Sequence, residues 1–117
     1  MVRGRMSEIQ VTILSRHQCE LCEVVLSTAR RLQATMSFGL NLKDIDADAH
    51  LLARYGSRVP VVLIDQVEAF SGKVSERELR QAIEKAGQKG SMSKFISWLK
   101  NRMFKKVVQQ GRREPGD

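Results

Sequence analysis

Both cysteines of this chain lie in one short stretch, Arg16-His17-Gln18-Cys19-Glu20-Leu21-Cys22. Residues 9–15, just before it, are rich in β-branched side chains and predict a strand. The residues after it carry apolar side chains at steps of three and four, which predicts a helix with one apolar stripe. That stripe contains Cys22, Val25, Leu26, Ala29, Leu32 and Met36. The cysteine pair therefore lies at a strand-to-helix turn, and the fold must contain such a unit.

The following segments continue to alternate between strands and helices. Residues 38–45 alternate apolar and polar side chains and predict a second strand, which we expect to run parallel to the first after a helical connection. The acidic residues of Asp46-Ala47-Asp48 can cap a short helix that ends at Gly56. Residues 59–64 are a continuous apolar run and predict a central strand with Pro60 at its beginning.

A hairpin and a capped helix complete the body of the chain. Residues 67–70 predict a short fourth strand, and Ser75 with Glu78 forms the capping box of the next helix. The order β-α-β-α-β-β-α predicts an α/β fold with a small mixed sheet and helices on its faces. We expect residues 8–87 to form this domain, after a flexible arm over residues 1–7. A basic amphipathic helical extension over 88–110 and a disordered tail over 111–117 are expected to follow.

The positive charge of the chain belongs to its C-terminal segment. Residues 1–87 hold 12 Lys and Arg against 11 Asp and Glu, whereas residues 88–117 hold 8 against 2. This charge predicts only a non-specific attraction to anions, so we expect no specific nucleic-acid partner. The sequence has neither a signal-peptide pattern nor an apolar run near the roughly 18 residues of a membrane span. A lone cysteine pair in such a chain indicates a cytoplasmic protein with a redox or metal site.

The spacing of the two cysteines suits thiol–disulfide exchange. The free amide groups at a helix N-terminus lower the pKa of a thiol, and Cys19 lies at that position. Cys22 begins the apolar stripe, so we expect Cys19 to attack a disulfide and Cys22 to resolve the mixed disulfide. Arg16 and His17 add positive charge beside Cys19, and we count them among the candidate substrate-binding residues. The nearby carboxylates of Glu20 and Glu23 oppose a thiolate.

Other uses of the cysteine pair stay open at this level. The two thiols can be inert residues of a helix. His17, Cys19 and Cys22 also offer three ligands for a metal, and His50 can complete a set of four. Structural zinc sites usually combine two separated ligand pairs, and this sequence has one, so we assign no metal ligand. A cluster shared between subunits, held by these thiolates and an exogenous thiol, is a further alternative.

Two segments distant from the cysteines are candidates for substrate binding. Pro60 can be an ordinary proline at the start of a strand, or it can form a cis peptide bond that presents the backbone of Val59 to a ligand. Ser71-Gly72 can be a simple turn before the capped helix. Its functional interpretation is a close approach of the backbone to an anion.

Several pieces of the chain, taken in order, resemble the glutaredoxin-like branch of the thioredoxin-fold proteins. They are the Cys-x-x-Cys pair opening a helix, Asp44-Ile45-Asp46, Tyr55-Gly56, Arg58-Val59-Pro60 and Phe70-Ser71-Gly72. The resemblance covers about residues 8–87. It implies a four-stranded mixed sheet flanked by three helices, with exchange at Cys19 and Cys22. It also implies a cis-proline at Pro60, with Val59 hydrogen-bonding glutathione or a bound peptide through its backbone.

The resemblance has three departures that concern glutathione. Glu20-Leu21 replaces the Pro-Tyr pair common between glutaredoxin cysteines, and Ser71-Gly72 replaces a Gly-Gly pair. The residues after Gly72 also lack the acidic side chain that often binds the glutathione amino group. We therefore expect no tightly bound cofactor, with glutathione as a candidate co-substrate and protein or small-molecule disulfides as partners.

The C-terminal extension predicts a helix outside the family core. The apolar stripe from Met92 to Val107 is suited to docking on the body of the protein. Trp98, Phe104 and Val108 project off that stripe among lysines and arginines. This combination is also typical of a helix that contacts a protein partner or an anionic membrane surface.

Two functions follow from the sequence. The first is a glutaredoxin-like thiol–disulfide oxidoreductase. The second is a non-catalytic thioredoxin-fold binding module, in which the dithiol holds a metal or cluster and the basic C-terminal helix recruits its partner or membrane.

Overall fold

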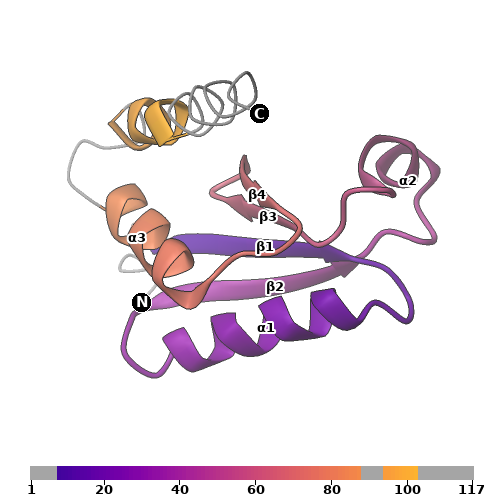
Figure 1. Cartoon of the computed structure of the whole chain (residues 1–117), viewed down its shortest axis with the longest axis horizontal. Coiled ribbons are helices and arrows are strands. Elements are labelled where there is room, and N and C mark those ends of the chain that lie inside the picture. Colours follow the sequence, from indigo (N-terminus) through magenta and orange to yellow (C-terminus); the bar gives the residue numbers. More distant parts are fainter. Residues whose placement is uncertain (1–7, 88–93, 103–117) are drawn as a thin grey trace, which may run out of the picture.

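The computed structural model of the chain describes residues 8–87 and 94–102 (Figure 1). In chain order the elements are β1 (Ile9–Ser15), α1 (Glu20–Leu32), β2 (Phe38–Asp44), α2 (Ala49–Tyr55), β3 (Val61–Ile64), β4 (Val67–Ser71) and α3 (Glu76–Ala86). Residues 94–102 form a further helix, called here the C-terminal helix. The predicted order β-α-β-α-β-β-α is confirmed.

The four strands form one mixed sheet in the order β2-β1-β3-β4. β1 pairs in parallel with β2 and antiparallel with β3, and β3 pairs antiparallel with β4. β1 and β3 are therefore the inner strands. The expected parallel pairing of the first two strands is confirmed, and so is the central position of the apolar run that follows Pro60.

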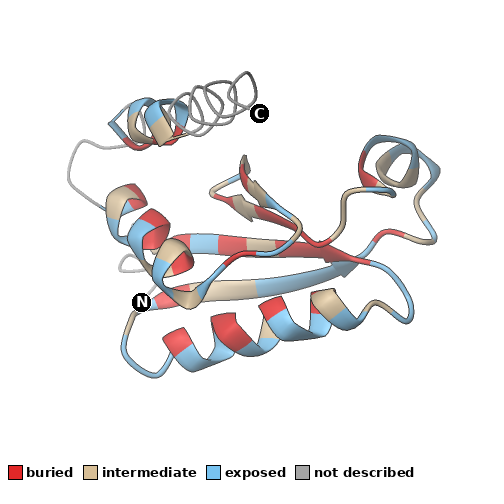
Figure 2. Cartoon of the chain, in the orientation of Figure 1, coloured by how far each residue is buried: buried red, intermediate tan, exposed pale blue. Residues whose placement is uncertain are grey.

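Two apolar clusters fill the two faces of this sheet. Ile13 of β1 belongs to the larger cluster, which includes side chains of α1, α3 and the C-terminal helix. Leu14, the next residue, belongs to a smaller cluster with Tyr55 of α2 and Val61 of β3. Because successive side chains of a strand point to opposite faces, α1 and α3 cover one face and α2 lies on the other. The buried positions of α1 follow the side of the helix that faces the sheet (Figure 2).

The helix caps explain where α1 and α2 begin and end. Asp48 is the N-cap of α2, where its carboxylate accepts a hydrogen bond from the backbone N–H of Leu51. α1 ends at Leu32 with Gln33 as its C-cap, so the prediction that Met36 continues the helical stripe is wrong. Met36 still packs against the larger cluster, from the turn after the helix.

β2 is an edge strand, and its second half is poorly covered. Phe38 is 4% exposed, whereas Leu42 is 53% exposed despite its apolar side chain. The alternation of the sequence places Leu42 on the same side of β2 as Phe38. The covering helix α1 therefore protects only the first part of this strand.

The C-terminal helix docks on the body through the side chains expected to do so. Phe95 is 0% exposed and Leu99 is 5% exposed, and both belong to the larger cluster. Trp98, which was predicted to project off the apolar stripe, is half-buried and packs against the same cluster, with its ring centroid 6.3 Å from that of Phe95. Arg102 donates a hydrogen bond of 2.8 Å to the Glu78 carboxylate of α3.

The other predictions for the ends of the chain fall outside the described residues. They concern the arm over 1–7, residues 88–93 and 103–110 of the extension, with Phe104 and Val108, and the tail over 111–117. Contact of the C-terminal helix with a partner or an anionic membrane stays a prediction. Within residues 8–87 and 94–102, no helix has the length and apolar character needed to cross a membrane.

Candidate functional site: a disulfide beside a cis-proline

Cys19 and Cys22 form a disulfide at the N-terminus of α1, with their Cα atoms 5.2 Å apart. Cys19 is the N-cap of the helix, and its Sγ accepts a hydrogen bond of 3.1 Å from the backbone N–H of Cys22. Cys22 is buried, at 5% exposure, whereas Cys19 is only partly covered. The two sulfur atoms therefore differ in access, and the first is the one that a partner molecule can reach.

The turn between β1 and α1 has an unusual backbone. Gln18, directly before Cys19, has a φ of 52°, in the left-handed region that side-chain-bearing residues rarely adopt. Such conformations are retained only where the surrounding contacts enforce them. At this turn, the two residues before Gln18 are held by polar contacts of the Arg16 side chain and the His17 backbone.

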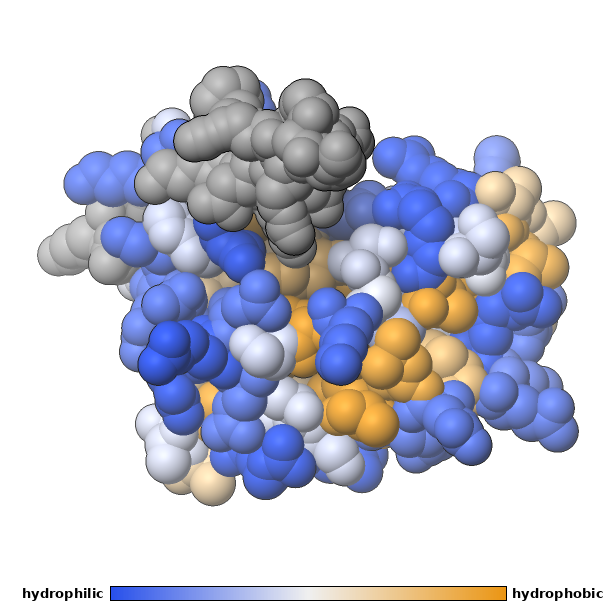
Figure 3. All heavy atoms as spheres, in the orientation of Figure 1, coloured by the Kyte–Doolittle hydropathy of each residue, from blue (hydrophilic) through white to orange (hydrophobic). Residues whose placement is uncertain are grey.

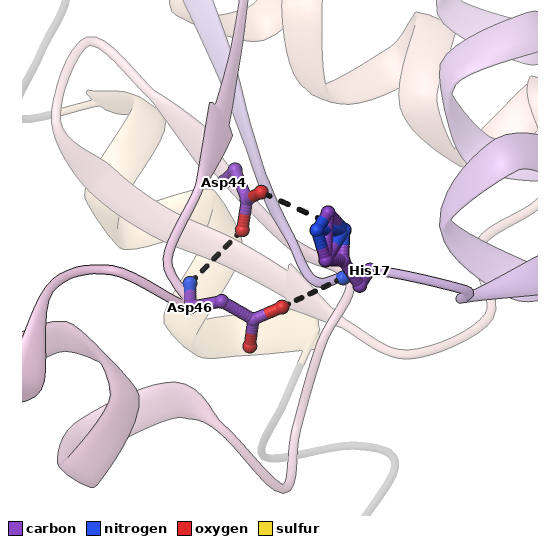
Figure 4. Close-up of side chains that lie close together, drawn as sticks. All are labelled: His17, Asp44 and Asp46. Atoms are coloured by element: carbon purple, nitrogen blue, oxygen red, sulfur yellow. Dashed lines mark hydrogen bonds and ion pairs between the residues drawn. The ribbon is translucent and has the colours of Figure 1, made fainter.

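Asp46 holds this turn from the loop after β2. Its Oδ1 atom accepts a hydrogen bond of 2.7 Å from Nε of Arg16, and its Oδ2 atom accepts one of 2.9 Å from the backbone N–H of His17. The backbone N–H of Asp46 in turn donates to Oδ1 of Asp44 at 2.9 Å (Figure 4). Arg16 also donates from Nη1 to the carbonyl of Gly56, 3.4 Å away. We call these contacts of Arg16, His17, Asp44 and Asp46 the Asp46 clamp.

The clamp stabilises the charged form of its central carboxylate. The hydrogen bond from the His17 backbone, followed by the one from the Arg16 side chain, holds the pKa of Asp46 below its ordinary value. Both bonds favour the ionised form because a carboxylate accepts hydrogen bonds better than a neutral acid does. Asp46 is therefore an anion across the neutral pH range, and the charge of Arg16 is balanced by it.

His17, Asp44 and Asp46 also bring potential metal-ligand atoms within 4.8 Å of one another. Most of their carboxylate oxygens already accept hydrogen bonds inside the clamp, and the cation next to Asp46 is the guanidinium of Arg16. This arrangement is explained as a clamp without a metal ion. The group includes neither cysteine, and His50 is not part of it.

The second half of the site is a cis peptide bond between Val59 and Pro60, just before β3. The carbonyl of Pro60 accepts a hydrogen bond of 2.7 Å from the backbone N–H of Gly72. The Ser71 hydroxyl donates to the carbonyl of Arg58 at 3.1 Å. Ser71 and Gly72 therefore hold the loop that carries the cis-proline.

The register of the sheet brings the two halves of the site together. Leu14 of β1 lies opposite Val61 of β3, and Val61 lies opposite Ser71 of β4. The cysteine turn follows β1 directly, and Pro60 directly precedes Val61. Both therefore lie at the same edge of the sheet as Ser71. Apolar surface gathers at this part of the molecule, over the N-terminal half of α1 (Figure 3), where Val24 is 56% exposed.

Comparison with known proteins identifies the family. Residues 10–84 match the family model described as "Glutaredoxin-like domain (DUF836)". The chain belongs to this glutaredoxin-like family. The uncharacterized protein Rv0508 of Mycobacterium tuberculosis is 34% identical to the chain over 86 residues, which cover 69% of this chain and 89% of the relative.

Solved structures agree with the fold of a glutaredoxin-like domain. Protein Ne2328 from Nitrosomonas europaea is 26% identical, with a TM-score of 0.57 over 63% of this chain and 89% of that one. A mutant thioredoxin from Halobacterium salinarum is 20% identical, with a TM-score of 0.56 over 69% of this chain and 76% of that one. The chain therefore has the thioredoxin fold, as the sequence predicted.

Asp46 makes more contacts in this candidate site than the sequence predicts. Asp46 was expected only as part of a motif and as a candidate helix cap, a role that Asp48 takes instead. A signal was present, because Arg16 and Asp46 each follow the end of a strand and the two strands were predicted to be parallel. The carboxyl ends of neighbouring parallel strands lie at one edge of a sheet, which predicts a pair between such residues.

Proposed function

We propose that the protein is a thiol–disulfide oxidoreductase in which Cys19 attacks and Cys22 resolves. The observation that carries this proposal is the unequal burial of two disulfide-bonded cysteines at the N-terminus of α1. A partly exposed sulfur at a helix N-terminus suits a nucleophile, because the free amides favour the thiolate. A buried sulfur one turn later suits an intramolecular resolving group.

The exchange begins from the reduced protein. The Cys19 thiolate attacks one sulfur of a substrate disulfide, which forms a mixed disulfide and releases the other substrate sulfur as a thiolate that takes up a proton. Cys22 then loses its proton and attacks Sγ of Cys19. This breaks the mixed disulfide, releases the second substrate thiol and leaves the Cys19–Cys22 disulfide. Two electrons pass to the substrate, and a thiol reductant must return them in the next cycle.

The substrates of this proposal are protein or small-molecule disulfides, with glutathione as a candidate co-substrate. The cis-proline loop supports a peptide-like partner, because Val59, which precedes the buried Pro60, is itself only half-buried. The exposed apolar side chain of Val24 supports a protein partner, since such surface gains free energy when it is covered. The electrons come from the dithiol, so the reaction needs no bound cofactor.

Single cysteine variants test both roles. Cys19→Ser is expected to abolish reduction of a model disulfide such as 2-hydroxyethyl disulfide. Cys22→Ser is expected to retain the first attack and to accumulate a mixed disulfide on Cys19, visible by mass spectrometry. The proposal fails if the reduced wild-type protein exchanges with no disulfide, or if Cys19→Ser is as active as the wild type.

A further inference from the structure

Arg16 lies three residues before Cys19, where a free cation would favour the thiolate. Three residues of fully extended chain span at most about 11 Å. The Debye length is about 10 Å at an ionic strength of 0.1 M, so the backbone positions of Arg16 and Cys19 lie within about one Debye length of each other. The structure pairs this charge with Asp46, however, through a hydrogen bond of 2.7 Å between Arg16 Nε and Oδ1 of the carboxylate.

We propose that Asp46 is a positioning residue that restrains the reactivity of Cys19 by lowering the ionised fraction of its thiol, because its carboxylate neutralises Arg16 and anchors the backbone before the attacking sulfur. The inference rests on the proposed attacking role of Cys19 and adds to it a residue that sets its strength. Asp46 acts through Arg16 and through the backbone N–H of His17. Its carboxylate makes no hydrogen bond to either cysteine sulfur in the described site.

The contacts of Asp46 allow its two effects to be separated. Asn at this position keeps a side-chain oxygen that can accept the hydrogen bond from the His17 backbone. It loses the negative charge, which leaves the Arg16 guanidinium uncompensated beside Cys19. Arg16→Gln does the reverse, because it leaves the Asp46 carboxylate uncompensated. The two variants break the same ion pair but change the local charge in opposite directions.

The other charged groups near the turn do not change between these variants. Glu20 and Glu23 occupy the first turn of α1, His17 and Asp44 lie in the clamp, and Lys73 follows the Ser71-Gly72 turn. Their influence on Cys19 is common to the wild type and to each variant, so it cancels from the comparison.

The test is a double-variant cycle in a Cys22→Ser background, in which Cys19 is the remaining thiol. The rate of alkylation by iodoacetamide, a neutral probe, is measured as a function of pH, because only the thiolate reacts. Asp46→Asn is expected to move the pH midpoint down and to raise the rate at fixed pH below it by about two- to tenfold. Arg16→Gln is expected to move the midpoint up. The double variant Asp46→Asn with Arg16→Gln is expected to return to the wild-type profile.

A second ion pair provides a matched control. Arg31, near the far end of α1, contacts the Glu76 carboxylate of α3 at 3.3 Å. Twelve helical residues separate Arg31 from Cys19, which corresponds to about 18 Å along the helix axis. Glu76→Gln therefore frees Arg31 beyond the Debye length, together with Arg80 of α3, which contacts the same carboxylate at 3.5 Å. This variant is expected to leave the alkylation profile unchanged.

Two results would overturn the inference. One is an Asp46→Asn profile that coincides with that of the wild type. The other is a shift in the same direction for Asp46→Asn and Arg16→Gln, which indicates that the ion pair only stabilises the turn. Failure of the proposed function is a separate outcome, because disulfide reduction by the wild-type protein is measured independently of alkylation.

Discussion

The hydroxyl of Ser71 donates a hydrogen bond to the backbone carbonyl of Arg58 across 3.1 Å. This bond joins the end of β4 to the loop that precedes the cis-proline. The ion pair of the Arg58 side chain with Glu68 joins the same loop to the first part of β4. β4 therefore holds Arg58, the residue before Val59, through both its backbone carbonyl and its side chain.

Ser71→Ala is expected to weaken substrate binding more than turnover. The variant loses one hydrogen bond, worth about 0.5–1.5 kcal/mol, and with it the restraint on the Val59 backbone. We expect KM for a peptide disulfide to rise by about two- to tenfold while kcat changes little. Ser57→Ala, at an exposed serine of the same loop, is the control. Equal KM values for the two variants would show that this bond does not support the binding loop.

Gly72→Ala is expected to destabilise the fold through the backbone alone. Gly72 has a φ of 85°, and a Cβ atom added there would meet nothing within 4 Å. An alanine in the left-handed region costs about 1–2 kcal/mol, and asparagine tolerates this region better. In urea unfolding we expect Gly72→Ala to lose about that much free energy and Gly72→Asn to lose less. A larger loss for the asparagine variant would contradict this explanation.

Glu78 is expected to make stability dependent on pH. Hydrogen bonds from the Ser75 backbone and then from Arg102 hold the pKa of Glu78 below its ordinary value of 4.5. A depressed carboxyl pKa contributes stability that is present above the unfolded pKa and is lost as the pH falls through the folded one. We therefore expect Glu78→Gln to be less stable than the wild type well above pH 4.5. The difference in stability between Glu78→Gln and the wild type should shrink as the pH falls through the pKa of Glu78 in the folded protein.

Chemical unfolding at several pH values checks this prediction. Glu84→Gln removes an exposed carboxyl from the same helix and serves as the control. The prediction is wrong if the stability difference between Glu78→Gln and the wild type is the same across the acid range.

Phe95→Ala is expected to release the C-terminal helix. The Phe95 side chain is 0% exposed in the larger apolar cluster, and removing such a side chain costs about 3–5 kcal/mol. The ring of Trp98, the single tryptophan, stacks on Phe95, so its fluorescence should shift toward that of a solvent-exposed indole. Ser97→Ala, on the exposed side of the helix, should change neither the stability of the protein nor the fluorescence of Trp98. An unchanged tryptophan spectrum in Phe95→Ala would argue against docking through this residue.

The order of the elements could be predicted because local signals agreed with the fold. Apolar periodicity and the Ser75–Glu78 capping box marked the helices, and both hydrogen bonds of that box are present. The position of Pro60 marked the start of β3. The exposure of Leu42 could not be predicted in this way, because alternation identifies a strand but does not reveal which strand is at the edge of the sheet.

The position of the cysteine pair at a helix N-terminus was predictable from the sequence, whereas the charge pairing around it was not. The cysteine pair is read directly from residue types and spacing. The residues alone leave the Val59–Pro60 bond open between cis and trans, and the family resemblance implies the cis bond that the structure has. Arg16 was expected to add positive charge beside Cys19, and the structure pairs this charge with the carboxylate of Asp46. That pairing depends on the register between β1 and β2, which places Ser15 opposite Asp44. The register between two strands depends on tertiary packing. The sequence therefore shows that Arg16 and Asp46 each follow a strand, but it does not show that they form an ion pair.

The row formed by Leu14, Val61 and Ser71 has a consequence for the synthesis of the protein. A nascent chain that extends to Asp44 already contains both cysteines and all the residues of β1, α1 and β2. Val59, Pro60 and Ser71 have not yet been translated at that stage. On the ribosome, the two cysteines of the proposed exchange therefore exist before the backbone that is proposed to bind their substrates.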